Sequence, residues 1–268
     1  MLALLLVALA QAHPGVVVLA GAGAAIDEKS CAELGGRDRL LLAVGDPSGV
    51  VDPLAAAGAP KARVDLDARR PFAGDDRETA ERIRSAPCIV LAGGGALDWF
   101  ELVTPGGGTS RLSDSIRAAH RDGATIVGCG AAAPYLAKWF MVERSALPDP
   151  ERNPRRHRED AAVEGLGLVR GLLVDTSARE QGDPGGMLRI AFDGHLERAL
   201  YLEGPTIWID DPDDRSARVA GSGRSILFDL GAARRQRGTW RGARLSLLRD
   251  GDRWSERGNV ECGEGGAA

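Results

Sequence analysis

The stretch TIVGCGAAAPYL (125–136) joins an apolar run to a turn made of small residues. An apolar strand that breaks at such a turn into a helix is where several hydrolase folds display a nucleophile. In the G-x-S-x-G frame of this nucleophile elbow, residues 128–132 have Gly130 at the apex, which carries no side chain. Three interpretations are open: an elbow that has lost its nucleophile, an elbow whose nucleophile has moved to Cys129, and an ordinary loop.

Apolar runs of the same kind recur through the first half of the chain and alternate with helix-compatible segments. The predicted strands are GVVVLA (15–20), LLLAV (40–44), ARVDL (62–66), CIVLA (88–92) and ATIVG (124–128). Near-continuous apolar strands that alternate with helices are typical of a mostly parallel sheet with helices on both faces. The fold class is therefore predicted to be α/β and doubly wound.

Two of the intervening segments carry helix boundary signals. Asp75 and Asp76 precede a polar helix that ends near Ser85, and acids are favourable at a helix N-terminus. The helix before the elbow strand has Ser110 or Ser113 as its cap and Gly123 at its end.

Glycine-rich turns follow three of the predicted strands, at 21–23, 93–95 and 128–130. Ligands of parallel sheets bind beyond the carboxyl ends of the strands, where these turns fall. The dinucleotide fingerprint is incomplete, because Ile26 stands at its third glycine after the first strand, and no phosphate-binding G-K-[ST] occurs. We therefore predict no nucleotide and no other cofactor.

The second half of the chain changes character. Residues 164–175 predict one more strand, and the stretches 217–230 and 239–254 predict C-terminal β-hairpins, the second around Asp250-Gly251. Residues 256–268 are predicted to be a flexible tail. No internal repeat or long linker occurs, so residues 13–255 are predicted to form a single domain.

The N-terminal segment allows two interpretations. Its apolar run ends in Ala10-Gln11-Ala12, which resembles a signal-peptide cleavage site, but a basic start is missing. Residues 1–12 are predicted to be a signal peptide, which implies export to the periplasm or the extracellular space. The alternative is a buried first element of a cytoplasmic protein. The run is too short to predict a transmembrane helix.

Charge and cysteine spacing exclude several functions. The net charge of −4 argues against nucleic-acid binding. The four cysteines are scattered without a C-x-x-C pair, which disfavours a zinc site. The acidic run 210–214 could attract calcium, but it lacks the EF-hand pattern and is predicted to be a solvated turn. We therefore predict no metal site.

The order of motifs resembles the cyanophycinase and dipeptidase E family of serine peptidases. The stretches that carry the resemblance are VVVLAGAG (16–23), CIVLAGGGALDWFELV (88–103), TIVGCGAAA (125–133), GLGLVRGLLVDTS (165–177), IWIDD (207–211) and VAGSGRSILFD (219–229). The resemblance implies a flavodoxin-like fold related to class I glutamine amidotransferase domains. It also implies a hydrolase of peptide bonds.

The family's catalytic residues are replaced in this chain. Its nucleophile motif G-T-S-A-G-A, laid on residues 128–133, puts Gly130 at the serine. Its D-Q-H-F motif keeps Asp175 but puts Ser177 at the histidine. A third motif, G-G-[ND]-Q, becomes Gly93-Gly94-Gly95-Ala96 and loses both polar side chains.

These replacements predict a protein without the family's chemistry. Serine attack needs a hydroxyl at the elbow and a base within hydrogen-bonding reach, and neither glycine nor serine supplies them here. We expect no catalytic residue, and a substrate cleft near Gly93, Gly94, Gly128, Cys129, Gly130 and Asp175 that binds a peptide or protein ligand. A purely structural interaction module is a further alternative. The oligomeric state stays open, with a dimer as one option.

An active hydrolase with Cys129 as its nucleophile is the second hypothesis. A thiol at a helix N-terminus has a lowered pKa and is nucleophilic. However, Cys129 precedes the apex by one residue, which predicts an inward-facing, packed side chain. The four histidines are His13, His120, His157 and His195. Each is predicted to be an ordinary surface or packing residue.

Overall fold

The computed structural model describes residues 14–263, apart from short gaps. The gaps are residues 25, 27–33, 35–37, 46–51, 53, 71, 104–108, 144–146, 148–155, 158–159, 177–183 and 237–238. The segment predicted to be a signal peptide, His13, Cys31 and Ser177 lie outside the described residues.

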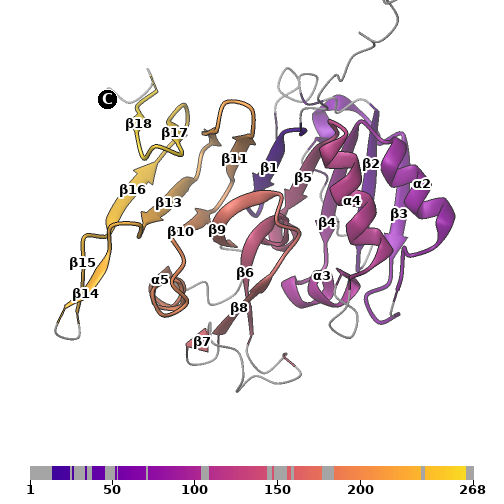
Figure 1. The fold of residues 1–268 in the computed structure, drawn as a ribbon. Coiled ribbons are helices and arrows are strands. Elements are labelled where there is room, and N and C mark those ends of the chain that lie inside the picture. Colours follow the sequence, from indigo (N-terminus) through magenta and orange to yellow (C-terminus); the bar gives the residue numbers. More distant parts are fainter. Residues whose placement is uncertain are drawn as a thin grey trace, which may run out of the picture.

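Nine strands form the first sheet. They are β1 (Val17–Ala20), β2 (Arg39–Val44), β3 (Ala62–Leu66), β4 (Cys88–Gly93), β5 (Thr125–Cys129), β11 (Thr206–Asp211), β12 (Ser216–Gly221), β17 (Arg253–Ser255) and β18 (Val260–Glu261). Their spatial order is β18-β17-β12-β11-β1-β5-β4-β2-β3 (Figure 1). Strands β1 to β5 are mutually parallel, and β11, β12, β17 and β18 extend the sheet in antiparallel fashion. The predicted α/β fold class and its parallel strands are confirmed.

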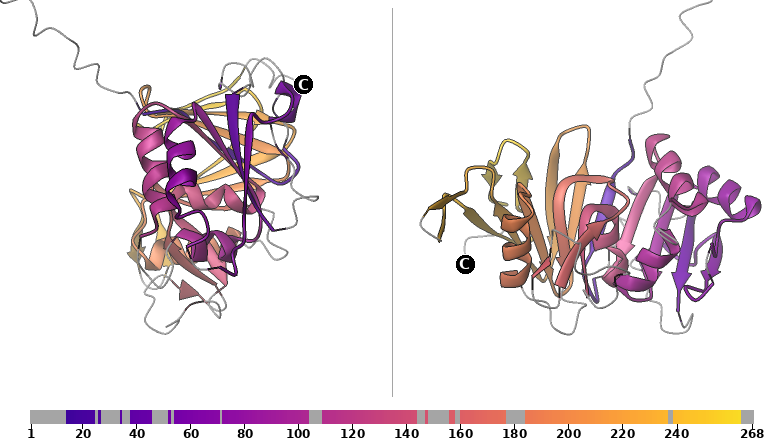
Figure 2. Two further views of the ribbon diagram at one scale, coloured as in Figure 1. Left: turned by 90° about the vertical axis from the view of Figure 1, so that its right-hand side faces the viewer. Right: turned by 60° about the horizontal axis from the view of Figure 1, so that its bottom comes forward.

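Three helices cover one face of the parallel strands. They are α2 (Arg77–Ser85), α3 (Ala96–Val103) and α4 (Arg111–Arg121), and Figure 2 shows α2 and α4 on the same side of the sheet. The Asp76 carboxylate accepts the Thr79 N–H at 2.8 Å, and the Ser110 hydroxyl accepts the Ser113 N–H at 3.1 Å. Gly123, at φ +99°, follows α4. The predicted helix boundaries are therefore confirmed, with Ser110 as the cap of α4.

The direction in which the chain progresses across the sheet reverses after β3. From β2 it moves outward to the edge strand β3, and it then crosses to β4 on the other side of β2. Val44 at the end of β2 pairs with Gly93 at the end of β4. In open α/β sheets, the crevice beyond such a reversal is the usual place for a ligand.

Seven further strands form the second sheet. They are β6 (Ala137–Glu143), β7 (Arg156–His157), β8 (Asp160–Glu164), β9 (Val169–Thr176), β10 (Arg198–Glu203), β13 (Arg224–Asp229) and β16 (Arg244–Leu248), in the order β16-β13-β10-β9-β6-β8-β7. Leu172 and Leu200 of this sheet share one buried apolar cluster with Leu19 and Trp208 of the first. Helix α5 (Pro184–Asp193) covers the opposite face through Met187 and its neighbours.

The C-terminal hairpins are present, but the two predicted stretches are not hairpins. The antiparallel pairs of consecutive strands are β11–β12, β17–β18 and the separate ribbon of β14 (Arg234–Gln236) with β15 (Thr239–Arg241). β12 and β13 lie in different sheets, as do β16 and β17. The turn at Asp250-Gly251 exists, with Gly251 at φ +85°. A turn dipeptide reverses the chain locally, but it does not determine which strands pair afterwards.

The ordered part of the chain extends past the boundary predicted at residue 255. Trp254 pairs with Val260, and Arg253 pairs with Glu261. Residues 256–261 therefore belong to a hairpin rather than to a flexible tail. None of the helices in the described part of the chain is long and apolar enough to cross a membrane.

Candidate functional site

The carboxyl ends of the parallel strands bring together most residues of the predicted cleft. Cys129 at the end of β5 is level with Ala20 of β1, and Gly93 at the end of β4 is level with Val44 of β2. The glycine-rich turns that follow β1, β4 and β5 therefore meet at one edge of the nine-stranded sheet, which we call the carboxyl edge.

Glycine is favoured at the two elbow positions, 128 and 130, for different structural reasons. A Cβ at Gly128 would lie 2.8 Å from Ala133 Cα and 2.9 Å from Leu136 Cδ1, so no side chain fits there. Gly130 has φ +58°, and a Cβ at this position would meet nothing within 4 Å. The apex therefore has the left-handed backbone that favours glycine, together with free space where a side chain would stand.

The segment after the elbow is not the predicted helix. Residues Gly130–Ala132 and Pro134–Leu136 form two short 3₁₀ turns, and β6 begins at Ala137. The Tyr135 ring is fully buried and stacks on Trp99, with the ring centroids 5.9 Å apart. This packing directs the chain into the second sheet before an α-helix can form. A single 3₁₀ turn provides little of the dipole that an α-helix would offer to an anion at this elbow.

Cys129 is a buried, neutral thiol. Its side chain is 8% exposed and belongs to the apolar cluster that contains Val90 and Ala92. Burial, together with the smaller effect of the negative charge of Asp52, raises the pKa of the Cys129 thiol to about 11. Asp52 is itself paired with the fully buried Arg39 at 2.5 Å. Cys129 therefore lacks the electropositive, accessible surroundings of a reactive cysteine.

The turn after β4 is closed by its own residues. Gly93 and Gly94 have φ values of +78° and +63°, and a Cβ at Gly94 would lie 2.7 Å from Val44 Cγ1. The Asp98 carboxylate accepts the Gly95 N–H at 2.7 Å, and the Trp99 indole N–H donates to the Gly93 carbonyl at 2.8 Å. Residues of α3 thus fix this turn at the carboxyl edge.

Asp175 stands apart from the other residues of the predicted cleft. It lies on β9 in the seven-stranded sheet and is 1% exposed. Leu173 belongs to the apolar cluster beneath α5, and alternate residues of a strand share a face, so Asp175 faces the same side. Its carboxylate accepts the Thr176 N–H at 2.9 Å.

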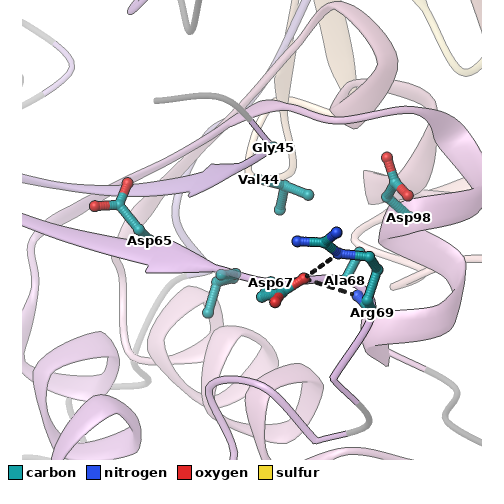
Figure 3. Close-up of a pocket in the computed structure, with 8 residues that line it drawn as sticks. Val44, Gly45, Asp65, Asp67, Ala68, Arg69 and Asp98 are labelled. Carbon is teal, nitrogen blue, oxygen red and sulfur yellow. Dashed lines mark hydrogen bonds and ion pairs between the residues drawn. The ribbon is translucent and has the colours of Figure 1, made fainter. Parts of the chain in front are cut away.

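A cavity of about 640 Å³ lies at the carboxyl edge beside β2 and β3 (Figure 3). Its polar residues are Asp65, Asp67, Arg69 and Asp98. Hydrogen bonds from Arg69 hold the pKa of the Asp67 carboxyl below its usual range, and Arg63 pairs with Asp65 at 2.8 Å. The sequence prediction missed this cavity, which is lined by residues at the carboxyl ends of β2 and β3 and by Asp98 of α3.

The acidic run 210–214 is only in part the predicted solvated turn. The Asp211 carboxylate accepts the N–H groups of Asp213 and Asp214 at 3.0 and 3.3 Å, as in an exposed turn. Asp210, however, is half-buried. Burial and, to a smaller extent, the charges of Glu256 and Asp211 raise the pKa of Asp210 to about 7, against an opposing effect of the Trp208 indole.

Two histidines can be placed in the fold together with their side chains. His120 is buried near the end of α4, at the opposite edge of the sheet from the elbow. His195 follows α5 with φ +54°. Within the described part of the chain, no group of three or more His, Cys, Asp or Glu residues is arranged to hold a metal ion.

This architecture is that of an α/β protein whose fold is similar to the fold of a peptidase. The chain is similar to the crystal structure of a peptidase from an acI-B1 Actinobacterium, with 18% identity, a TM-score of 0.62, and 91% of this chain and 98% of that chain covered. A protein from Listeria monocytogenes EGD-e, provisionally described as peptidase E, aligns with 10% identity, a TM-score of 0.48, and 78% and 99% coverage. No protein-family model matches the sequence, and no curated protein matches it significantly.

Substituting alanine for Gly128 and for Gly130 should distinguish the effect of steric overlap from the effect of backbone strain. Gly130→Ala should lower the free energy of unfolding by about 1–2 kcal/mol, the cost of a left-handed backbone for a residue with a Cβ. Gly128→Ala should cost about 3 kcal/mol or more, because its methyl group overlaps backbone atoms of residues 132 and 133. Urea denaturation measures both, and equal losses would contradict the elbow geometry.

Thiol labelling should distinguish Cys129 from an exposed cysteine. Cys262 is exposed, whereas Cys88 and Cys129 are buried. In a Cys31→Ser background, iodoacetamide at neutral pH should label Cys262 rapidly and label Cys129 only after denaturation. Peptide mass spectrometry provides the measurement, and a Cys262→Ser variant provides the control. Rapid labelling of Cys129 in the folded protein would show a thiolate that this structure does not support.

Asp210→Asn should stabilise the protein at high pH only. The pKa of Asp210 rises from 3.8 to about 7 on folding. The protonated carboxyl therefore contributes fully to the free energy of unfolding below about pH 4, and this contribution is lost as the pH rises through 7. At pH 8 the variant should gain roughly 2–4 kcal/mol over the wild type, with little difference at pH 4. Asp214→Asn, an exposed change in the same turn, is the control. Parallel stability curves for wild type and Asp210→Asn would disprove the raised pKa.

Proposed function

We propose that this protein is a non-catalytic relative of the cyanophycinase and dipeptidase E serine peptidases that binds a peptide or protein ligand at its carboxyl edge. The fold likeness to a peptidase, at a TM-score of 0.62, supports the relationship. The ordered series of family-like motifs in the sequence also supports it. Fold by itself does not supply function, so the proposal depends on the site.

The observation that carries the proposal is the conformation of Gly130. The apex keeps a left-handed backbone with φ +58° and open space at its Cβ position, as an elbow that displays a side chain requires. The residue itself has no nucleophilic group. Without a nucleophile, an acyl-enzyme does not form, and only the weak catalysis of the remaining binding groups is left.

The described imidazoles do not replace the missing base. His120 lies near the end of α4, which leads into the amino end of β5, and so stands across the sheet from Gly130. His195 belongs to the turn between α5 and β10. A general base must reach the group that it deprotonates within hydrogen-bonding distance.

The competing hypothesis is an active hydrolase that uses Cys129. Burial of the thiol and its raised pKa of about 11 argue against it, since only the thiolate is an effective nucleophile. The two 3₁₀ turns after the elbow remove the long helix that would otherwise lower this pKa. No observation in the described residues favours Cys129 over inert packing.

Hydrolysis and binding assays on the purified full chain test the proposal. Aspartyl dipeptides and cyanophycin should remain uncleaved, with no product above the protein-free blank by mass spectrometry. Calorimetry with the same peptides should detect binding to the wild type and to Gly130→Ala. Binding should be lost in Gly130→Phe, which imposes the same backbone strain but fills the open space at the apex.

Two outcomes would overturn the proposal. Hydrolysis by the wild type that disappears in Cys129→Ser would establish the altered-site hydrolase. Equal affinity of Gly130→Ala and Gly130→Phe, or the absence of peptide binding in all variants, would remove the elbow as a binding surface and favour a structural module. Circular dichroism of each variant ensures that the comparison is made between folded proteins.

A further inference from the structure

A second cavity, of about 400 Å³, lies at the edge of the nine-stranded sheet opposite to the elbow. β11 is antiparallel to β1, so Asp210 near the end of β11 pairs with Val17 at the start of β1. His120, near the end of α4, and Glu256, in the turn after β17, reach the same cavity. Segments that are far apart in the sequence therefore converge here, and none of them belongs to the carboxyl edge.

The cavity has an excess of negative charge. Asp210, Asp211 and Glu256 contribute carboxylates, and within the described part of the chain no Lys, Arg or His side chain forms an ion pair with any of the three. Arg198 donates to the Glu256 backbone carbonyl at 2.9 Å rather than to its carboxylate. Arg215, the arginine of the lining, is exposed.

This arrangement destabilises the folded protein when Asp210 is ionised. A half-buried carboxylate that faces two others is unfavourable when it is ionised, and the pKa of Asp210 accordingly rises to about 7. A cation bound beside Asp210 would remove this cost, because it favours the ionised carboxylate. Perturbed acids that line a cavity are a recognised feature of binding and active sites.

Apolar side chains form the rest of the wall. Leu168, which precedes β9, and Leu172 of β9 contribute from the second sheet, and Trp254 contributes from β17. The Arg198 guanidinium lies 5.0 Å from the centroid of the Trp254 ring, so this ring already makes a cation–π contact within the chain. The volume lies within the range of small-molecule sites, which combine apolar walls with a few converging polar groups.

We propose that this cavity is a second binding site, for a small organic cation: a protonated amine on a short apolar chain. The ammonium group lies between the carboxylates of Asp210 and Glu256, and the apolar chain packs against Leu168 and Leu172. A metal ion fits less well, since the described residues form no group of three or more ligands arranged for one. The site is independent of the elbow and of any peptide that binds there.

Calorimetry with three probes of the same chain length tests the charge preference. n-Butylamine should bind the full-length protein in the millimolar range at pH 7, butan-1-ol at least tenfold more weakly, and butyrate not detectably. Titrations in two buffers of different ionisation enthalpy should show release of up to roughly half a proton per amine, because the amine favours ionised Asp210. Proton uptake would contradict the assignment.

Matched variants test the residues. Asp210→Asn and Glu256→Gln should each weaken butylamine binding at least tenfold, and Asp210→Asn should also abolish the proton release. Glu261→Gln removes one exposed charge from the same hairpin and should leave the affinity within twofold of the wild type. Asp210→Asn should fold, because it removes an unfavourable buried charge. Unchanged affinity in both cavity variants, or tighter binding of butyrate than of butylamine, would overturn the proposal, whereas the peptide assays on Gly130 would be unaffected.

Discussion

The close packing of residues 133–136 against Gly128 is the constraint on which both sheets depend. A Cβ at Gly128 would lie within 3 Å of Ala133 Cα and of Leu136 Cδ1, so this approach requires a residue without a side chain. It allows the chain to turn back directly after β5 and to enter β6 through two 3₁₀ turns. Tyr135 then inserts between Trp99 of the helical layer and Phe140 of the second sheet, and it stacks on the first and contacts the second edge-on. One glycine thus determines how the elbow ends and how the two sheets join.

Much of the first sheet was predictable because its signals are local. A continuous apolar run identifies a buried parallel strand, and Asp76 and Ser110 identify the helix starts by supplying an acceptor for a free backbone N–H. The path after the elbow was not predictable from local signals, since it depends on contacts of Tyr135 with residues that are 36 positions earlier and five positions later. The predicted hairpins failed for the same reason. Gly221 and Gly223 approach the backbone of residues 203–206 so closely that β12 and β13 separate into different sheets.

The candidate site shows the same division between local and distant information. Gly93, Gly94, Gly128, Cys129 and Gly130 lie at or directly after the carboxyl ends of parallel strands, and such positions meet at one edge for topological reasons. It could not show the burial of the Cys129 thiol, which depends on Val90 and Ala92 of the neighbouring strand. Likewise, the environment of Asp210 involves Glu256, which is 46 residues away. A run of acids in the sequence gives no sign that one member is desolvated while the others remain in water.

The two cavities differ in how their carboxylates are balanced, and this difference has a physical meaning. At the carboxyl edge, Asp65 and Asp67 are paired with Arg63 and Arg69, which lie two residues away in the sequence. Such exposed pairs neutralise charge at little cost and need no ligand. At the opposite edge, ionisation of Asp210 is unfavourable because of its burial and the charges of Glu256 and Asp211, and a neutral residue there would avoid this cost above about pH 7. In natural proteins the residue at most positions is consistent with the fold, and the exceptions lie mainly at functional sites. A cost that the fold itself does not require is therefore better explained by a ligand that offsets it than by packing.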